Sequence, residues 1–453
     1  MYLRGMKARK MPYLRKLGLQ IIASLTMVGG LNAQSFDTAK LNRYFNRLDS
    51  NQRFMGSVAV FKQGKPVYQH ATGWADLKNG MKADAHTRYR IGSITKTFTS
   101  VLVMKTVEAG KIRLDQTIEP WFPGVRNAQR ITVRHLLTHR SGIHNITDNP
   151  GFMTRAIQPW TKERMLDTIN AQISDFEPGT SFRYSNSGYI LLTLMLEKIW
   201  NRPYEQLLKK WILKPARLKE TIYGIKPDPT QNMALSYRML FGNWVVQPMT
   251  DPSVPLGAGS MMSTPADICR FAEKLFKGKL IRAESLAEMT RWQENTGGGL
   301  FRFPFGTSWA SGHTGGIDAY LSVYGHFQSE DISFAITSNA TNMVLNDVTI
   351  SLLSATFDKS YTIPDFSVVQ LSDNELDRYV GVYVSKQVPM KLTITRKNGN
   401  LLCQATGQLP FTLAAHGEHR FSFDKAGIEI RFEPDEKRMR FQQGGGRYLF
   451  MRE

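Results

Sequence analysis

The spacing of hydrophobic positions changes several times along the chain, and each change predicts a different element. Apolar and polar positions alternate over residues 56–76, which predicts a β-hairpin. Over residues 94–107 the apolar residues mostly follow helical spacing, and Gly110 ends that predicted helix. A nearly all-apolar run over 189–199 predicts a buried helix. Alternation returns over 313–339, which predicts a pair of strands.

A further change of pattern lies near residues 358–372, where Ile363-Pro364-Asp365 is typical of a linker. Beyond it, short apolar segments such as 379–383 and 428–432 are separated by turn residues, including Asn398-Gly399. Short strands joined by strong turns predict a small antiparallel β-barrel at the C-terminus. The sequence shows no polar constellation in this region, so we expect it to have an accessory role.

The first 33 residues have the three parts of a secretory signal peptide. Basic residues come first, an apolar run over 17–28 follows, and Leu31-Asn32-Ala33 offers a small-residue cleavage site. The apolar run is short for a membrane span. We expect the chain to be exported to a bacterial periplasm or secreted, with no transmembrane span after cleavage; an uncleaved anchor is the alternative.

The stretch Arg90-Ile91-Gly92-Ser93-Ile94-Thr95-Lys96 carries the candidate chemistry, because it runs from a loop into the helix predicted after residue 94. Ser93 and Lys96 are three residues apart and therefore share one face of the first turn. A serine hydroxyl becomes a good nucleophile only when a base removes its proton. A lysine whose pKa is lowered by burial and by the helix dipole can act as that base.

Two further strings follow in order: Tyr184-Ser185-Asn186 and His313-Thr314-Gly315-Gly316. Together with the S-x-x-K string, they make the sequence resemble the serine β-lactamase and penicillin-binding-protein superfamily, specifically its class C-like branch. That branch contains class C β-lactamases, DD-carboxypeptidases, D-aminopeptidases and related esterases. The resemblance covers roughly residues 40 to 355.

The resemblance implies an α+β fold, with an antiparallel sheet flanked by helices and an all-helical region. The small C-terminal barrel is similar to the lipocalin-like domains of some family members. We therefore expect a signal peptide over 1–33, a serine hydrolase domain over 34–360 and a β domain over 365–453.

The resemblance also implies a role for each residue of the three strings. Ser93 would form an acyl-enzyme, and Lys96 and Tyr184 would share the proton transfers; which of the two is the base stays open. The remaining expected substrate contacts are Asn186 with the amide, His313 and Thr314 with a carboxylate, and Gly315 and Gly316 on the strand beside the substrate.

The sequence departs from β-lactamases at one position: their third motif usually begins with Lys, whereas here it begins with His313. A His at that place is similar to DD-peptidases and D-aminopeptidases. It also lacks the E-x-x-L-N string that carries the class A deacylation glutamate. We therefore expect a substrate that is a D-amino-acid peptide or amide, or a small ester. The alternatives are a β-lactamase and a non-catalytic protein that binds penicillin or senses peptidoglycan fragments.

The formal net charge of +20 indicates either attraction to anionic envelope polymers or membrane surfaces, or simply a solvated basic surface. No nucleic-acid motif is present, so we expect no nucleic-acid partner. The two cysteines, Cys269 and Cys403, lie among apolar residues and are expected to be free thiols. No metal or organic cofactor is expected, and the expected partners are a small-molecule or short-peptide substrate and cell-wall peptidoglycan fragments.

Overall fold

The computed structural model describes residues 36–240, 242–443 and 446–453. The signal peptide expected over 1–33 lies outside these residues. In the described part of the chain, no helix is both long enough and apolar enough to cross a membrane.

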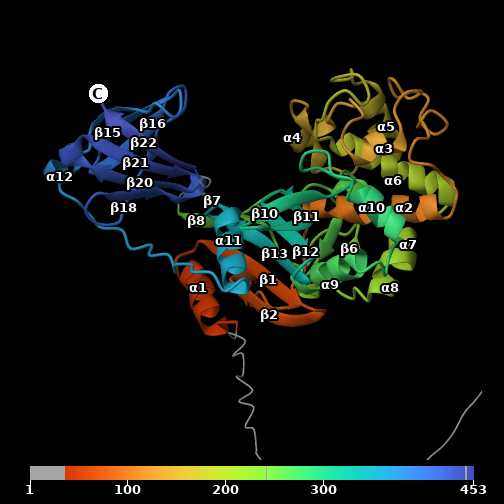
Figure 1. Cartoon of the computed structure of the whole chain (residues 1–453), viewed down its shortest axis with the longest axis horizontal. Helices are drawn as coiled ribbons and strands as arrows, with labels where there is room; N and C mark the ends of the chain where they lie inside the picture. The colour runs from red at the N-terminus through yellow and green to blue at the C-terminus, as the bar shows by residue number, and fades with distance from the viewer. Residues whose placement is uncertain (1–35, 241, 444–445) are drawn as a thin grey trace, which may run out of the picture. The chain divides into compact units, whose positions relative to one another are not determined.

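A six-stranded antiparallel sheet forms the centre of the catalytic region, in the order β10-β11-β12-β13-β1-β2 (Figure 1). The hairpin expected over 56–76 is present as its last two strands, and the strands expected over 313–339 lie next to them. The chain also supplies an edge strand over 301–305. The bounds are β1 Phe54–Lys62, β2 Lys65–Thr72, β10 Phe301–Phe305, β11 Ser308–Ile317, β12 Tyr320–Phe327 and β13 Ile332–Thr341.

Helices cover both faces of this sheet (Figure 1). Helices α1 (Thr38–Ser50) and α11 (Leu345–Thr356) bury Phe45 and Leu352 against one face. Helix α9 (Pro265–Phe276) packs on the other face and stacks Phe271 on Phe98 of α2 (Thr95–Glu108) at 3.7 Å between ring centroids. Strand β1, which lies between β13 and the edge strand β2, is buried on both sides, which explains its nearly continuous apolar sequence.

A helical region surrounds α2 and α6 (Asn186–Trp200). The buried helix expected over 189–199 is confirmed, although it begins three residues earlier, so that Asn186 belongs to the helix rather than to the loop before it. The shorter helices there are α3 Val133–Leu137, α4 Phe152–Ala156, α5 Lys162–Asn170, α7 Tyr204–Leu208, α8 Lys214–Ala216 and α10 Ala283–Met289. Three small sheets contain β3 Trp74–Asp76, β4 Met81–Lys82, β5 Tyr89–Arg90, β6 Ile222–Tyr223, β7 Tyr237–Leu240, β8 Asn243–Val246 and β9 Met261–Ser263.

The C-terminal region confirms the expected barrel. Nine antiparallel strands form one sheet in the order β17-β16-β15-β14-β22-β21-β20-β19-β18. The two end strands are separated in sequence by Leu413 alone, so the sheet is nearly closed. Helix α12 (Asp373–Asp377) precedes it. The strands are β14 Gly381–Val384, β15 Lys391–Lys397, β16 Asn400–Ala405, β17 Phe411–Thr412, β18 Ala414–Ala415, β19 Arg420–Phe423, β20 Ile428–Glu433, β21 Arg438–Gln443 and β22 Gly446–Arg452.

Candidate active site

Ser93 lies in a 3₁₀ turn, Gly92–Ile94, that continues directly into α2. This geometry places the side chain of Lys96 one turn further along the same face. The Nζ atom of Lys96 is 3.0 Å from Oγ of Ser93, 2.8 Å from Oδ1 of Asn186 and 2.8 Å from the backbone oxygen of Ala258. Three groups that are far apart in sequence therefore converge on one amine.

Burial determines the protonation of Lys96, whose side chain is fully buried. Desolvation lowers the pKa of Lys96 well below its ordinary value. No carboxylate contacts the Nζ atom within ion-pair distance among the described residues, so nothing offsets that loss of solvation. A neutral amine donates two hydrogen bonds, to Asn186 and to Ala258, and turns its lone pair to the hydroxyl of Ser93.

Tyr184 lies next to this pair, with the centre of its ring 4.9 Å from Nζ of Lys96. Burial raises the pKa of Tyr184 strongly, and a hydrogen bond with Ser93 only partly opposes that effect. The imidazole of His139 stacks on the Tyr184 ring at 4.3 Å between centroids, and its Nδ1 accepts a hydrogen bond from the backbone N–H of Ser185. Tyr184 therefore keeps its proton at neutral pH and is held in place from one side.

Asn186 accepts a hydrogen bond from Lys96 through its amide oxygen, and its amide nitrogen donates to two other residues. Its Nδ2 donates to Oδ1 of Asn145 and Oγ1 of Thr147, both at 3.2 Å. Asn145 also accepts the backbone N–H of Asn186 at 3.0 Å. The sequence analysis did not single out Asn145 and Thr147, because a short polar residue in a loop has no motif of its own. These contacts fix the orientation of Asn186, and through it the position of Lys96.

The glycines of β11 bring the strand against the Ser93 turn. A Cβ atom on Gly315 would lie 2.0 Å from the backbone oxygen of Ile91, and a Cβ on Gly92 would lie 2.9 Å from the backbone nitrogen of Gly316. Gly92 also has φ of +49°, a left-handed conformation that glycine adopts easily. These glycines therefore allow two segments of the protein, β11 and the Ser93 turn, to approach each other closely.

His313 is buried beside Tyr184 and Phe301, with ring centroids 6.3 Å and 4.9 Å away. Its Nδ1 makes a short contact with the backbone oxygen of Thr314, and its Nε2 is buried with no partner among the described residues. Burial is the main cause that lowers the pKa of His313 to about 3, and Lys96 lowers it further whenever its amine is protonated. The imidazole is therefore neutral throughout the physiological range.

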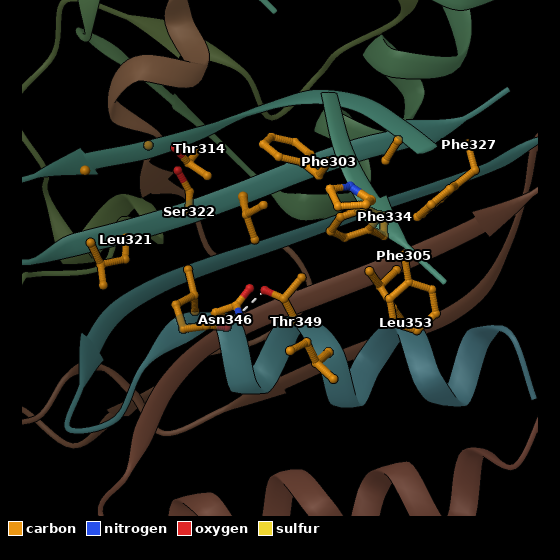
Figure 2. A pocket seen from close by; sticks show the side chains of 17 residues that line it. Phe303, Phe305, Thr314, Leu321, Ser322, Phe327, Phe334, Asn346, Thr349 and Leu353 are labelled. Atoms are coloured by element: carbon orange, nitrogen blue, oxygen red, sulfur yellow. Dashed lines mark hydrogen bonds between the residues drawn. The ribbon is translucent and has the colours of Figure 1, made fainter. Parts of the chain in front are cut away.

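Thr314 faces a different space from His313, because successive side chains of a strand point to opposite faces. It borders a pocket of about 440 Å³ between the sheet and α11, together with Phe303, Val323 and Ile350. Figure 2 shows Thr314 on the strand above Asn346 and Thr349 of the helix. The structure thus brings together Ser93, Lys96, Tyr184 and Asn186, and places Thr314 in a second pocket.

The pocket at Ser93 has a volume of about 270 Å³. Asp318 is the only charged residue that lines it in the described chain. Its Oδ2 accepts a hydrogen bond from Arg90 at 2.8 Å, and its Oδ1 accepts from the backbone and hydroxyl of Thr250 at 2.9 and 2.7 Å. The other lining residues include Phe152, Met153, Ile190, Val254, Pro255, Ile317, Thr147, Asn186 and Gly316.

The chain is similar to several known proteins over most of its length. The chain is 24% identical to Penicillin-binding protein 4* of Bacillus subtilis (strain 168) over 433 residues, which is 86% of this chain and 93% of that protein. It is 25% identical to the D-amino acid amidase of Ochrobactrum anthropi SV3, with a TM-score of 0.63 over 71% of this chain and 99% of that one. The octameric penicillin-binding protein homologue from Pyrococcus abyssi, at 23% identity, shares the fold over 91% of this chain and 100% of its own, with a TM-score of 0.66.

A family model described as Beta-lactamase matches residues 41–352, which include every residue of the site described above. The match extends over more than half of the chain, and it ends before the C-terminal barrel. On this match, the chain belongs to the beta-lactamase family of serine hydrolases.

Proposed function

We propose that Ser93 is the nucleophile of an acyl-enzyme mechanism and that Lys96 is its base. The observation that carries this proposal is the 3.0 Å contact between Nζ of Lys96 and Oγ of Ser93 at a fully buried amine. A neutral amine at that distance removes the proton of a hydroxyl as the oxygen attacks. Tyr184 is a poor base in this site because its pKa is raised rather than lowered.

The proposed reaction has two halves. Oγ of Ser93 attacks an acyl carbonyl, its proton passes to Lys96, and the backbone N–H groups of Ser93 and Gly316 hold the oxyanion. The leaving amine or alcohol takes a proton through the hydroxyl of Tyr184, which recovers one from Lys96. Water then attacks the acyl-enzyme and passes a proton to Lys96. Lys96 returns that proton to Oγ of Ser93 as the acyl–Oγ bond breaks and the acid leaves.

The proposed substrates are D-amino-acid amides or peptides, or small esters, in which no carboxylate enters the Ser93 pocket. Among the described residues that line this pocket there is no lysine or arginine, and the only charged one is the acidic Asp318. Buried His313 is neutral and supplies no charge either. The apolar side chains of Phe152, Met153 and Val254 suit an apolar acyl side chain. The similarity to a D-amino acid amidase supports this choice.

Export to a periplasm or beyond the cell, with peptidoglycan fragments as substrates, belongs to the same proposal. Its support is the signal-peptide pattern over residues 1–33 and the similarity to Penicillin-binding protein 4*. A secreted hydrolase of D-amino-acid peptides meets such substrates in the cell wall.

The test is a hydrolysis panel with covalent labelling. D-phenylalanine amide, a p-nitrophenyl ester, a D-Ala-D-Ala peptide and nitrocefin are assayed with the parent and with Ser93→Ala, and a fluorophosphonate probe reports labelling. We expect the amide and the ester to exceed the carboxylate-bearing peptide at least about tenfold in kcat/KM, which is roughly 1.4 kcal/mol. Nitrocefin as the best substrate would instead favour the β-lactamase alternative, and labelling without turnover would favour the binding protein.

A further inference from the structure

The outer surface of the barrel carries five arginines on strands β19 to β22, which we call the arginine face: Arg420, Arg431, Arg438, Arg440 and Arg447. The opposite side of the same strands is apolar and fills the barrel core, for example with Phe421, Ile430 and Phe441. The arginines therefore occupy the solvent-facing positions of the alternation. Their clustering comes from the pairing of strands, and no run of basic residues announces it in the sequence.

Three of these arginines stand directly opposite one another across neighbouring strands. Arg420 pairs in register with Arg431, and Arg431 pairs in register with Arg440. Adjacent strands are about 4.8 Å apart, so three guanidinium groups start within about 10 Å. Like charges directly opposite on a sheet destabilise it. The exposed positions offer no burial of apolar surface that would offset this repulsion.

Acidic neighbours neutralise only part of the arginine face. Glu433 pairs with Arg438 and with Arg440, and Arg438 also reaches Glu436. Among the described residues, no carboxylate lies within ion-pair distance of Arg420, Arg431 or Arg447, whose side chains are all exposed. The guanidinium groups of these three arginines are therefore exposed to solvent, and their N–H donors are available to a ligand.

The surface is also hollow. All five arginines line one cavity of about 970 Å³, together with Gln387, Gln442 and Tyr448. The acidic Asp365, Asp424 and Glu429 also line it, so the arginines outnumber the carboxylates. The pocket at Ser93 measures about 270 Å³, so this hollow accepts a considerably larger ligand. A flat bilayer does not enter a concave surface, whereas a flexible chain does. Amide groups and a tyrosine ring beside the arginines are suited to hydroxyl groups and to a sugar face.

We propose that the arginine face binds an anionic oligosaccharide, with carboxylate or phosphate groups on the sugars paired to Arg420, Arg431 and Arg447. Arginine rather than lysine at all five positions supports recognition of planar or tetrahedral oxyanions, which its rigid fork contacts through two N–H groups at once. Gln387 and Gln442 contact the neutral hydroxyl groups between the charges. This site is separate from Ser93, and its occupancy does not depend on the reaction proposed there.

The test measures binding of size-defined oligogalacturonate to the full chain by calorimetry, with dextran of equal length as the uncharged control. We expect oligogalacturonate to bind and dextran not to bind. Raising sodium chloride from about 50 to about 500 mM is expected to weaken the complex, because salt screens contacts between exposed charges. A phosphorylated oligosaccharide of the same length shows whether phosphate or carboxylate is preferred. Equal binding of dextran contradicts the proposal.

Matched variants locate the site. Arg420→Gln with Arg431→Gln is expected to weaken binding at least about tenfold, while Lys386→Gln with Lys397→Gln, which removes the same charge from exposed positions outside the hollow, is expected to leave it unchanged. Arg420→Lys with Arg431→Lys keeps the charge and is expected to recover only part of the loss. All four positions are exposed, and thermal unfolding verifies that each variant folds.

Two outcomes overturn the proposal. Equal losses in the glutamine pair on the arginine face and in the lysine control pair would mean that net charge alone attracts the polymer. Binding to vesicles that contain phosphatidylserine, lost on Arg420→Gln with Arg431→Gln, together with no binding of either oligosaccharide, would assign the face to a membrane surface instead.

Discussion

The groups around Ser93 and those on the arginine face differ in burial, and therefore in charge. In the pocket, desolvation lowers the pKa of Lys96 well below its ordinary value and that of His313 to about 3, so ionisable groups become neutral. On the outer surface of β19–β22, Arg420 and Arg431 stay exposed and charged beside each other. The comparison teaches that a strongly basic protein can have a reaction site with little net charge, with the electrostatic attraction located elsewhere.

The largest expected effect tests proton transfer inside the neutral pocket. Tyr184→Phe keeps the ring that stacks on His139 and removes only the hydroxyl. We expect kcat to fall about 10²-fold, the usual scale for a general acid–base group, while the thermal unfolding temperature changes little. Steady-state kinetics on the p-nitrophenyl ester and on the D-aminoacyl amide measure the effect. A loss below tenfold on both substrates would assign every proton transfer to Lys96.

The next test concerns the close packing that builds the pocket, and it compares adjacent glycines. Gly315→Ala places a Cβ 2.0 Å from the oxygen of Ile91, whereas Gly316→Ala meets only the side chain of Leu321 at 3.6 Å. We expect Gly315→Ala to lower the rate of Ser93 labelling at least about tenfold and to destabilise the fold by about 1–3 kcal/mol, the usual scale for overpacking. Gly316→Ala should fold like the parent, as measured by urea unfolding. Equal stability of the two variants would contradict the packing described for β11.

A smaller effect is expected when the two regions are separated. A chain that ends at Thr362 lacks the barrel, and with it the ion pairs that Arg47 makes with Asp365 and Arg53 makes with Asp424. Both pairs are partly exposed and contribute little to stability. We expect Ser93 labelling within about twofold of the parent and complete loss of oligogalacturonate binding, the latter resting on the proposed arginine face. An insoluble or unlabelled product would mean that residues 365–453 complete the catalytic fold.

The smallest expected effect is that the preference between a carboxylate-bearing and a neutral substrate does not change with pH. If His313 carried charge near neutral pH, it would favour carboxylate-bearing substrates in acid. Its pKa of about 3 means that the imidazole is already neutral at pH 5.5 and stays so at pH 8. We therefore expect the ratio of kcat/KM for a carboxylate-bearing ester to that for a neutral ester to be flat across this range, since protonation of Lys96 affects both alike. A ratio that falls as pH rises would show that a positive charge on His313 contributes to binding the substrate carboxylate.

The sequence predicted the part of the structure that local spacing controls. The separation of Ser93 and Lys96 by one helical turn requires only the period of a helix, and the sheet and barrel follow from alternation and turn residues. It did not reveal Asn145 beneath Asn186, the ion pair of Arg90 with Asp318, or the Arg420-Arg431-Arg440 row. Each of these depends on contacts between segments distant in sequence or on strand register, which single-sequence patterns do not specify.

The expectation for His313 differs from the structure for a related reason. An imidazole in the third motif was expected to meet a substrate carboxylate, and its pKa in water is about 6.5. The structure buries it next to Phe301 and Lys96, where the charged imidazolium loses its solvation. We therefore expect His313 to act as a neutral hydrogen-bond donor that orients the strand beside Tyr184, and not as a cation that meets a substrate carboxylate.

The most direct test of the central claim is the pH dependence of covalent labelling at Ser93. The rate constant for fluorophosphonate capture is measured from pH 5 to pH 10.5, with Ser93→Ala as the blank and Lys96→Met as the control that removes the base. A base whose pKa is lowered by burial loses its proton well below the pH at which an ordinary lysine does, so the account predicts a rate that rises in acid and becomes level well before pH 10.5. A rate that keeps rising towards pH 10.5, as an ordinary lysine would produce, would contradict the assignment of Lys96 as a neutral base on Ser93.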